Sequence, residues 1–137
     1  MRFLHTADWQ MGMKATHTGE ASEKVRAARL ETLATLAAIA REQRVDFVLV
    51  AGDVFEDNGV DRVLIQKVVD RMNQFPVPVY VIPGNHDPLV PGSVWEHPAW
   101  KSAPHVHVLR EAQAVEAPGG VLYPCPCFEK YSIHDPT

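Results

Sequence analysis

The sequence predicts an α/β fold in which helices connect the strands of a parallel sheet. Three short apolar runs alternate with two longer segments of helical periodicity, giving the order strand–helix–strand–helix–strand. The middle run, 47–51, is apolar without a break, as in a strand that is covered on both faces. At 137 residues, of which 46% are hydrophobic, the chain is long enough to bury a core of one domain. Right-handed crossovers and a parallel sheet are therefore expected.

Each element is justified by its own local pattern. The first helix has apolar residues on one broad face with charges between them, and the second repeats Leu64, Val68 and Met72 at four-residue spacing. The third strand begins at prolines, which a strand tolerates where no ladder donor is needed. The expected elements are, in order, strand 2–6, helix Ser22–Arg44, strand Phe47–Ala51, helix Val60–Asn73 and strand Val77–Ile82.

After Asp87 the pattern changes to a long connection, 88–104, with room for a short helix. Three short strands are then expected at Val106–Leu109, Ala114–Glu116 and Val121–Tyr123, and Pro118-Gly119-Gly120 is a hairpin turn between the last two. No repeat and no linker divides the sequence. We therefore expect residues 1–137 to belong to a single domain.

Charge and cysteine content exclude several classes of protein. The net charge of −4 offers no basic field across the whole chain for nucleic acid, so DNA binding would need a local patch or a metal. Two cysteines are too few for a disulfide framework and fit a reducing compartment. No stretch approaches the roughly 18 consecutive apolar residues of a membrane helix. A cytoplasmic protein without membrane contact is expected.

Polar residues follow each of the three expected strands. Asp8 follows the first, Asp53 the second, and Gly84-Asn85-His86-Asp87 the third. Because ligands of parallel sheets bind at the carboxyl ends of the strands, these side chains should gather at one edge. Amide and carboxylate oxygens bind hard metal ions, and an imidazole beside a carboxylate can donate a proton.

These segments resemble the calcineurin-like metallophosphoesterase family. The family pattern is Asp-x-His, then Gly-Asp-x-x-Asp, then Gly-Asn-His followed by Asp or Glu, and the chain has Asp8-Trp9-Gln10, Gly52–Asp57 and Gly84–Asp87 in that order. The phrases at 5–9, 51–55 and 123–126 are more specifically similar to the SbcD-type DNA repair nucleases. The resemblance implies a four-layer α/β/β/α sandwich. This chain would supply its first sheet with the helices, and the start of the second sheet, as the N-terminal portion of a nuclease domain.

The resemblance also implies roles for individual residues. Asp53 would bridge two divalent ions, Asp8 would bind the first ion, and the Asn85 amide oxygen the second. His86 would act at the leaving group as a general acid or stabilise charge there, while Asp87 would orient its ring. Oxygen-rich ligation favours Mn²⁺ or Mg²⁺, and the family's additional histidines extend the choice to Fe and Zn.

Two departures from the family pattern are visible. Gln10 stands where most members have a metal-binding histidine, so either its amide oxygen binds more weakly or a water takes that place. The family's later Gly-His and Gly-His-x-His motifs do not occur in these 137 residues. The metal site of this chain alone is therefore expected to be incomplete.

Several other residues have competing interpretations. His105-Val106-His107 could imitate a metal-binding pair but is better explained as an edge strand, and Cys125-Pro-Cys127 as two reduced thiols. His5 is expected to be a partly buried histidine of the first strand. Asp57 matches the last Asp of the family's second motif, and capping of a turn or of the second helix explains it equally well.

Substrate contacts are also open at this stage. Trp9 either packs under the site or stacks on substrate. The cations that follow the first motif would touch a phosphate backbone or form a solvated helix face; they are Lys14, Lys24, Arg26 and Arg29. Leu64, Val68 and Met72 are most simply core, although the resemblance allows a dimer contact on that helix.

Three functions are consistent with these patterns. The first is a metal-dependent DNA exonuclease or endonuclease that acts on duplex ends, with an SbcC-like ATPase partner and a homodimer implied by the resemblance. In it, a water activated between two ions would attack the phosphodiester. The second is a phosphodiesterase for nucleotides or small phosphoesters, which the acidic balance favours. The third is a non-catalytic or truncated interaction module, motivated by Gln10 and the missing histidines.

Overall fold

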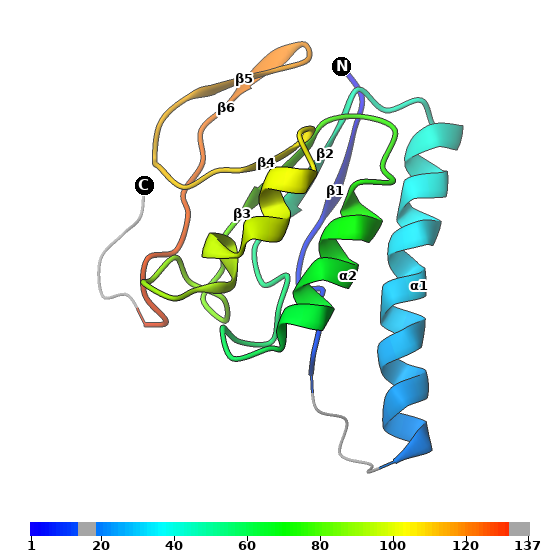
Figure 1. Cartoon of the computed structure of the whole chain (residues 1–137). Helices are drawn as coiled ribbons and strands as arrows, with labels where there is room; N and C mark the ends of the chain where they lie inside the picture. Colours follow the sequence, from blue (N-terminus) through cyan, green and yellow to red (C-terminus); the bar gives the residue numbers. More distant parts are fainter. Residues whose placement is uncertain (14–18, 132–137) are drawn as a thin grey trace.

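The computed structural model describes residues 1–13 and 19–131. A parallel sheet in the order β1-β2-β3-β4 carries α1 and α2 on one face, and a separate hairpin, β5-β6, follows (Figure 1). The elements are β1 Phe3–Thr6, α1 Glu20–Glu42, β2 Phe47–Ala51, α2 Arg62–Met72, β3 Val79–Ile82, the 3₁₀ turns η1 Val94–Glu96 and η2 Pro98–Ser102, β4 Val106–Val108, β5 Val115–Ala117 and β6 Gly120–Leu122.

The predicted α/β class is confirmed, and every expected element is present with ends shifted by a few residues. The short helix expected in the connection after Asp87 takes the form of η1 and η2. One feature exceeds the prediction: β4 joins the first sheet as a parallel neighbour of β3, with Val106 opposite Val79. The parallel sheet therefore has one strand more than the three that the strand–helix pattern predicts.

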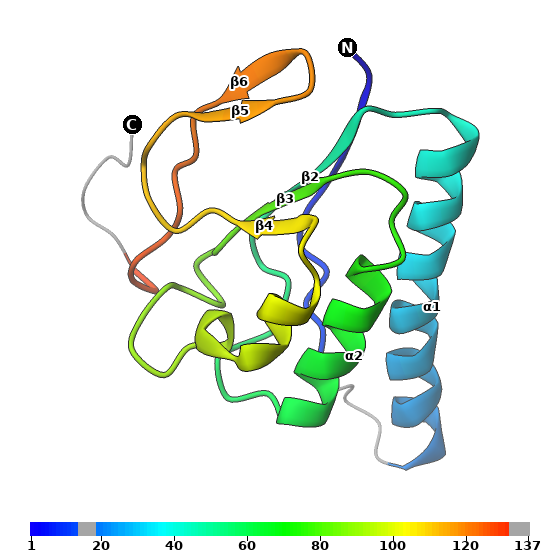
Figure 2. The same cartoon turned by 45° about the horizontal axis from the view of Figure 1, so that its top comes forward.

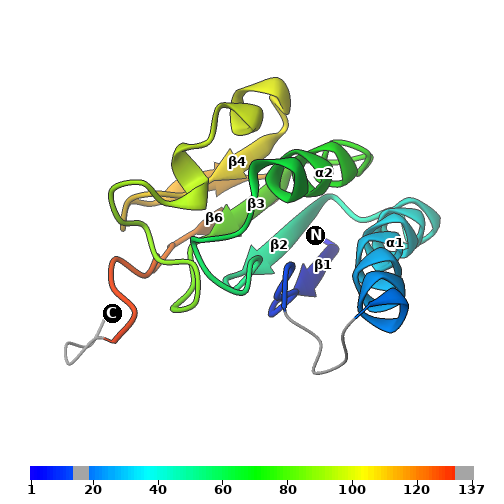
Figure 3. The same cartoon turned by 60° about the horizontal axis from the view of Figure 1, so that its bottom comes forward.

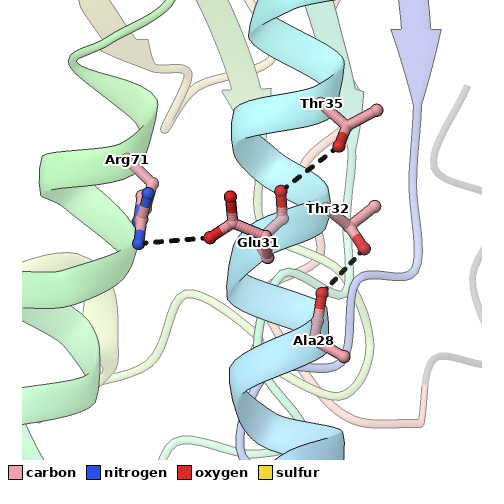
Figure 4. Close-up of polar contacts among 5 residues, drawn as sticks. All are labelled: Ala28, Glu31, Thr32, Thr35 and Arg71. Carbon is pink, nitrogen blue, oxygen red and sulfur yellow. Dashed lines mark hydrogen bonds and ion pairs between the residues drawn. The ribbon is translucent and has the colours of Figure 1, made fainter.

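The helical layer supplies the core over one face of the sheet. Val68 and Met72 of α2 are fully buried as predicted, whereas Leu64 is only half-buried. Asp61 caps the first turn of α2, since its Oδ1 accepts from the backbone N of Leu64 at 2.8 Å. An ion pair joins the two helices: Nη2 of Arg71 lies 3.7 Å from Oε2 of Glu31 (Figure 4). Because the pair is accessible to solvent, it contributes little to stability. No helix within residues 1–13 and 19–131 is long and apolar enough to cross a membrane.

The opposite face of the sheet is only partly covered, by the hairpin and the chain that follows it (Figures 2 and 3). Leu49 is half-buried and Ala51 is exposed, so complete cover on both faces of β2 is not found in the described residues. A cavity of about 260 Å³ lies between this face and residues 122–125. The prediction that His5 is partly buried is wrong, because its ring points to this open side and is exposed.

Candidate metal centre at the strand ends

The three motif segments lie side by side beyond the carboxyl ends of β1, β2 and β3. The backbone N of Asp8 donates to the Gly52 carbonyl at 3.1 Å, and that of Gln10 to the Asp53 carbonyl at 3.0 Å. On the other side, the backbone N of His86 donates to Oδ1 of Asp53 at 2.9 Å. Asp53 therefore lies between the first and third segments.

Three residues of this edge adopt the left-handed backbone region without being glycine. The φ angles are 55° for Asp8, 46° for Gln10 and 52° for Asp53. Such conformations cost about 1 kcal/mol or more each and persist where surrounding contacts hold them, commonly at functional sites. No sequence signal indicates this strain, because aspartate and glutamine occur in many loop conformations.

Gly84 allows the third segment to approach Asp53. A Cβ at this position would collide with Oδ1 and the backbone N of Asp53. Gly52 faces it, since a Cβ there would lie 3.0 Å from the Cα of Gly84, and its φ of 85° also favours glycine. The two glycines let the strand ends pack backbone to backbone.

Asp87 is fully buried and ties two loops together. Its Oδ1 accepts from the backbone N of Gly84 at 2.8 Å and its Oδ2 from that of Phe55 at 2.9 Å, while its carbonyl accepts from Nε1 of Trp95. Burial raises the pKa of the carboxyl to about 6, helped by the charge of Asp53 and opposed by the two backbone donors. These contacts differ from the expected one with the ring of His86.

The ring of His86 is held by a backbone carbonyl instead. Its Nδ1 lies 3.1 Å from the carbonyl oxygen of Glu56. Because a carbonyl only accepts, Nδ1 carries a proton and Nε2 is the atom available for chemistry. Sequence reasoning missed this partner, because the side-chain type at residue 56 carries no information about its carbonyl.

The two predicted substrate contacts have different outcomes. The Trp9 indole is 9% exposed and donates from Nε1 to Oγ1 of Thr6 at 2.8 Å, so its position supports packing under the site. Lys14 lies outside the described residues. Of the other cations, Lys24 pairs with Glu20 at 3.4 Å on an exposed surface and Arg26 is exposed, as a solvated helix face requires.

The remaining candidates lie in structural positions. His105 and His107 flank Val106 at the sheet edge, and β4 starts at the end of the sheet away from Asn85. The ring of His107 stacks on Tyr80. Asp57 caps a turn, since its Oδ1 accepts from the backbone N of Gly59 at 2.7 Å.

Cys125 and Cys127 are half-buried free thiols. The backbone N of Cys127 donates to the Pro83 carbonyl at 3.0 Å, which places this residue beside the third segment. Burial raises the pKa of the Cys127 thiol, and the charges of Asp53 and Asp87 add to the rise. The thiol is therefore kept in its neutral, unreactive form.

The donor chemistry of this edge fits a hard divalent cation. Asp8 and Asn85 are exposed, and Asp53, whose segment lies between theirs, is buried. These are carboxylate and amide oxygens, which such cations prefer. Within the described part of the chain, no group of three or more His, Cys, Asp or Glu side chains lies close enough to hold a metal. The described residues supply an oxygen-donor set of two carboxylates and an amide.

Similarity to known families identifies the class of protein. The calcineurin-like phosphoesterase model matches residues 1–135. The chain belongs to the calcineurin-like phosphoesterase family. This confirms the resemblance drawn from the three motifs, and the family's common chemistry is phosphoester hydrolysis with divalent metal ions.

Curated relatives include nuclease subunits. The chain is 29% identical over 91 residues to the SbcD subunit of nuclease SbcCD from Bacillus subtilis, covering 64% of this chain and 22% of the relative. It is 37% identical over 93 residues to the same-named protein of Rhodobacter capsulatus, with coverages of 64% and 22%. The uncharacterized metallophosphoesterase YhaO of Bacillus subtilis is 29% identical over 121 residues, with coverages of 82% and 28%. The matches thus span between 22% and 28% of the length of these relatives.

Proposed function

We propose that this chain forms the N-terminal portion of a metal-dependent phosphodiesterase domain that hydrolyses DNA. The observation that carries the proposal is the convergence of Asp8, Asp53 and Asn85-His86 at adjacent strand ends, joined by hydrogen bonds from backbone N–H groups, in a chain of this family. DNA is supported by the relatives named as parts of the nuclease SbcCD.

Four side chains are the proposed ligands of the metal site. Two divalent ions, when bound, supply charge neutralisation on the phosphoryl oxygens and an activated water. Asp8, Asp53 and the Asn85 amide oxygen would hold these ions, with Asp53 as the ligand shared between them. Gln10 would add an amide oxygen, a weaker ligand than imidazole. Mn²⁺ is the proposed ion because the described donors are all oxygens.

His86 acts on the departing oxygen. Its Nδ1–H donates to the Glu56 carbonyl, which leaves Nε2 for the leaving group. In the imidazolium form, Nε2 carries a second proton and would give it, or a hydrogen bond from it, to the departing oxygen, while Nδ1 keeps its own proton. Asp87 contributes indirectly, because it joins the segment of His86 to that of Asp53 through Gly84 and Phe55. We assign it as a positioning residue.

The same family relation supports the remaining parts of the proposal. The SbcCD relatives are named as one subunit of a nuclease with more than one kind of subunit. By analogy we propose a homodimer with an SbcC-like ATPase partner, acting on duplex ends in the cytoplasm. The reduced thiols are compatible with that compartment.

The test compares the wild type with Asp53→Asn and with a matched surface change, Asp70→Asn. Calorimetric titration with Mn²⁺ should show binding that Asp53→Asn abolishes and Asp70→Asn leaves unchanged. In the full-length protein, linear duplex DNA should be degraded with Mn²⁺ by the wild type and by Asp70→Asn but not by Asp53→Asn. Equal degradation by all three proteins would indicate a contaminating nuclease and contradict the proposal.

A small chromogenic phosphodiester, assayed beside duplex DNA, tests the alternative substrate class suggested by the net charge of −4. Faster turnover of the small ester than of DNA would favour a nucleotide or small-molecule phosphodiesterase. Mn²⁺ binding without hydrolysis of either substrate would favour the non-catalytic alternative.

A further inference from the structure

Arg29 of α1 reaches the first motif segment, unlike the other cations of its helix. Its Nη1 donates to the carbonyl oxygen of Gln10 at 3.0 Å and to that of Trp9 at 3.3 Å. The side chain is half-buried, whereas Lys24 and Arg26 are exposed. Neither sequence interpretation of these cations, a phosphate contact or a solvated face, describes this position.

The first motif segment needs a partner on that side. Its backbone N–H groups are used by the second segment, since Asp8, Gln10 and Met11 donate to the carbonyls of residues 52, 53 and 54. Arg29 of α1 donates to the carbonyls of Trp9 and Gln10, and the Gln10 carbonyl also accepts from the backbone N of Met13 at 3.2 Å. Loss of Arg29 would therefore leave the part-buried Trp9 carbonyl without the donor that the described contacts give it, at the cost of an unsatisfied backbone acceptor.

The backbone at these positions is also strained. Asp8 and Gln10 have φ angles of 55° and 46°, on either side of Trp9. Such conformations revert unless surrounding contacts over-determine them. A guanidinium donating to two carbonyl oxygens is a charge-assisted contact, stronger than a neutral hydrogen bond. It therefore holds the segment in the conformation that directs the Asp8 and Gln10 side chains to the edge of the sheet.

We infer that Arg29 is a positioning residue for the metal centre: it fixes the strained segment that presents Asp8 and Gln10 as ligands. The inference rests on the proposed metal site. The guanidinium is engaged by main-chain oxygens, so it acts through the ligands and does not contact a substrate phosphate.

The experiment measures Mn²⁺ affinity by calorimetry for the wild type, Arg29→Met, Arg29→Lys and the matched control Arg26→Met. Loss of contacts that orient metal ligands typically weakens metal affinity about 10–100-fold, and we expect Arg29→Met to fall in that range. Arg29→Lys should be intermediate, because the shorter ammonium keeps the charge and a donor but reaches only part of the contact. Arg26→Met should bind like the wild type.

A spectroscopic readout separates positioning from general destabilisation. The electron paramagnetic resonance spectrum of Mn²⁺ bound at saturation should change in Arg29→Met and not in Arg26→Met, while circular dichroism reports whether each variant is folded. Should Arg29→Met fail to fold, the comparison of Arg29→Lys with the wild type carries the same test.

Two outcomes would overturn the inference. In one, both Arg29 variants keep wild-type Mn²⁺ affinity and spectrum. In the other, they keep these but weaken binding of duplex DNA, which would make Arg29 a phosphate contact. Asp53→Asn distinguishes the failures: if it also retains Mn²⁺ binding, the proposed metal site itself is wrong, whereas if it abolishes binding, only the role of Arg29 fails.

Discussion

The first and third motif segments reach the same edge of the sheet, but they are held there in different ways. Asp87, inside the third segment, binds the backbone of Gly84 three residues earlier and of Phe55 in the neighbouring loop. In the first segment, Nε1 of Trp9 donates to Oγ1 of Thr6 and the backbone N of Met13 donates to the Gln10 carbonyl. A side chain from a helix is added there, because Arg29, about twenty residues further along the chain, donates to the Trp9 and Gln10 carbonyls. The side chain that ties the third segment to a neighbouring loop, Asp87, belongs to that segment, whereas Arg29 reaches the first segment from α1.

Burial follows the same division. Asp87 is fully buried and Trp95, also fully buried, donates to its carbonyl, so the third segment is continuous with the core. In the first segment, Trp9 and Met11 are buried, but Asp8 is exposed and Arg29 is half-buried. A change at Asp87 should therefore be seen mainly in stability, and a change at Asp8 or Arg29 mainly in metal binding.

The largest effect is expected for Asp87→Asn. The amide nitrogen would face a backbone N–H in place of an acceptor, leaving a buried donor unsatisfied and removing a charge-assisted bond. We expect the free energy of unfolding to fall by about 2–4 kcal/mol, measured by urea denaturation. The exposed Asp70→Asn change should stay within about 0.5 kcal/mol of the wild type. Equal stability of the two variants would remove the distinction between the segments.

The second-largest effect is expected for Gly84→Ala. Its Cβ would collide with the carboxylate and backbone of Asp53, so either the third segment or the ligand must move. Overpacking of this kind costs about 1–3 kcal/mol of unfolding free energy, and Mn²⁺ affinity should also fall. Gly59→Ala is the control, because its Cβ would meet only the carboxylate of Asp57, an exposed residue. Wild-type Mn²⁺ affinity in Gly84→Ala would show that the close approach is not needed.

The smallest expected effect is the change in the free energy of unfolding with pH. The pKa of Asp87 is raised from 3.8 to about 6, so its contribution to stability is fully present below pH 3.8 and is lost as pH rises through about 6. In metal-free buffer with EDTA, the wild type should lose about 1 kcal/mol relative to Asp87→Asn between pH 5 and 7. Denaturant titrations of both proteins across this range provide the measurement. A stability difference that is constant with pH would contradict the raised pKa.

Much of the fold could be predicted because its signals are local. Helical periodicity places α1 and α2, and apolar runs place β2 and β3, within a few residues of their observed ends. The pairing of β4 with β3 was not predictable, because three residues of strand carry too short a pattern to indicate a partner. The exposure of His5 depends on what covers the open face of the sheet, which its own neighbours in sequence do not decide.

The class of chemistry could be inferred from the order of residues alone. Gly84-Asn85-His86-Asp87 and the aspartates after two other strands place oxygen donors and an imidazole at one edge, because parallel strands end on the same side. How these groups are held became visible only in three dimensions. The Glu56 carbonyl fixes His86, Asp87 joins two loops, and Arg29 holds the strained segment of Asp8. Such contacts depend on main-chain atoms, which every residue type carries, and so they leave no pattern in a sequence.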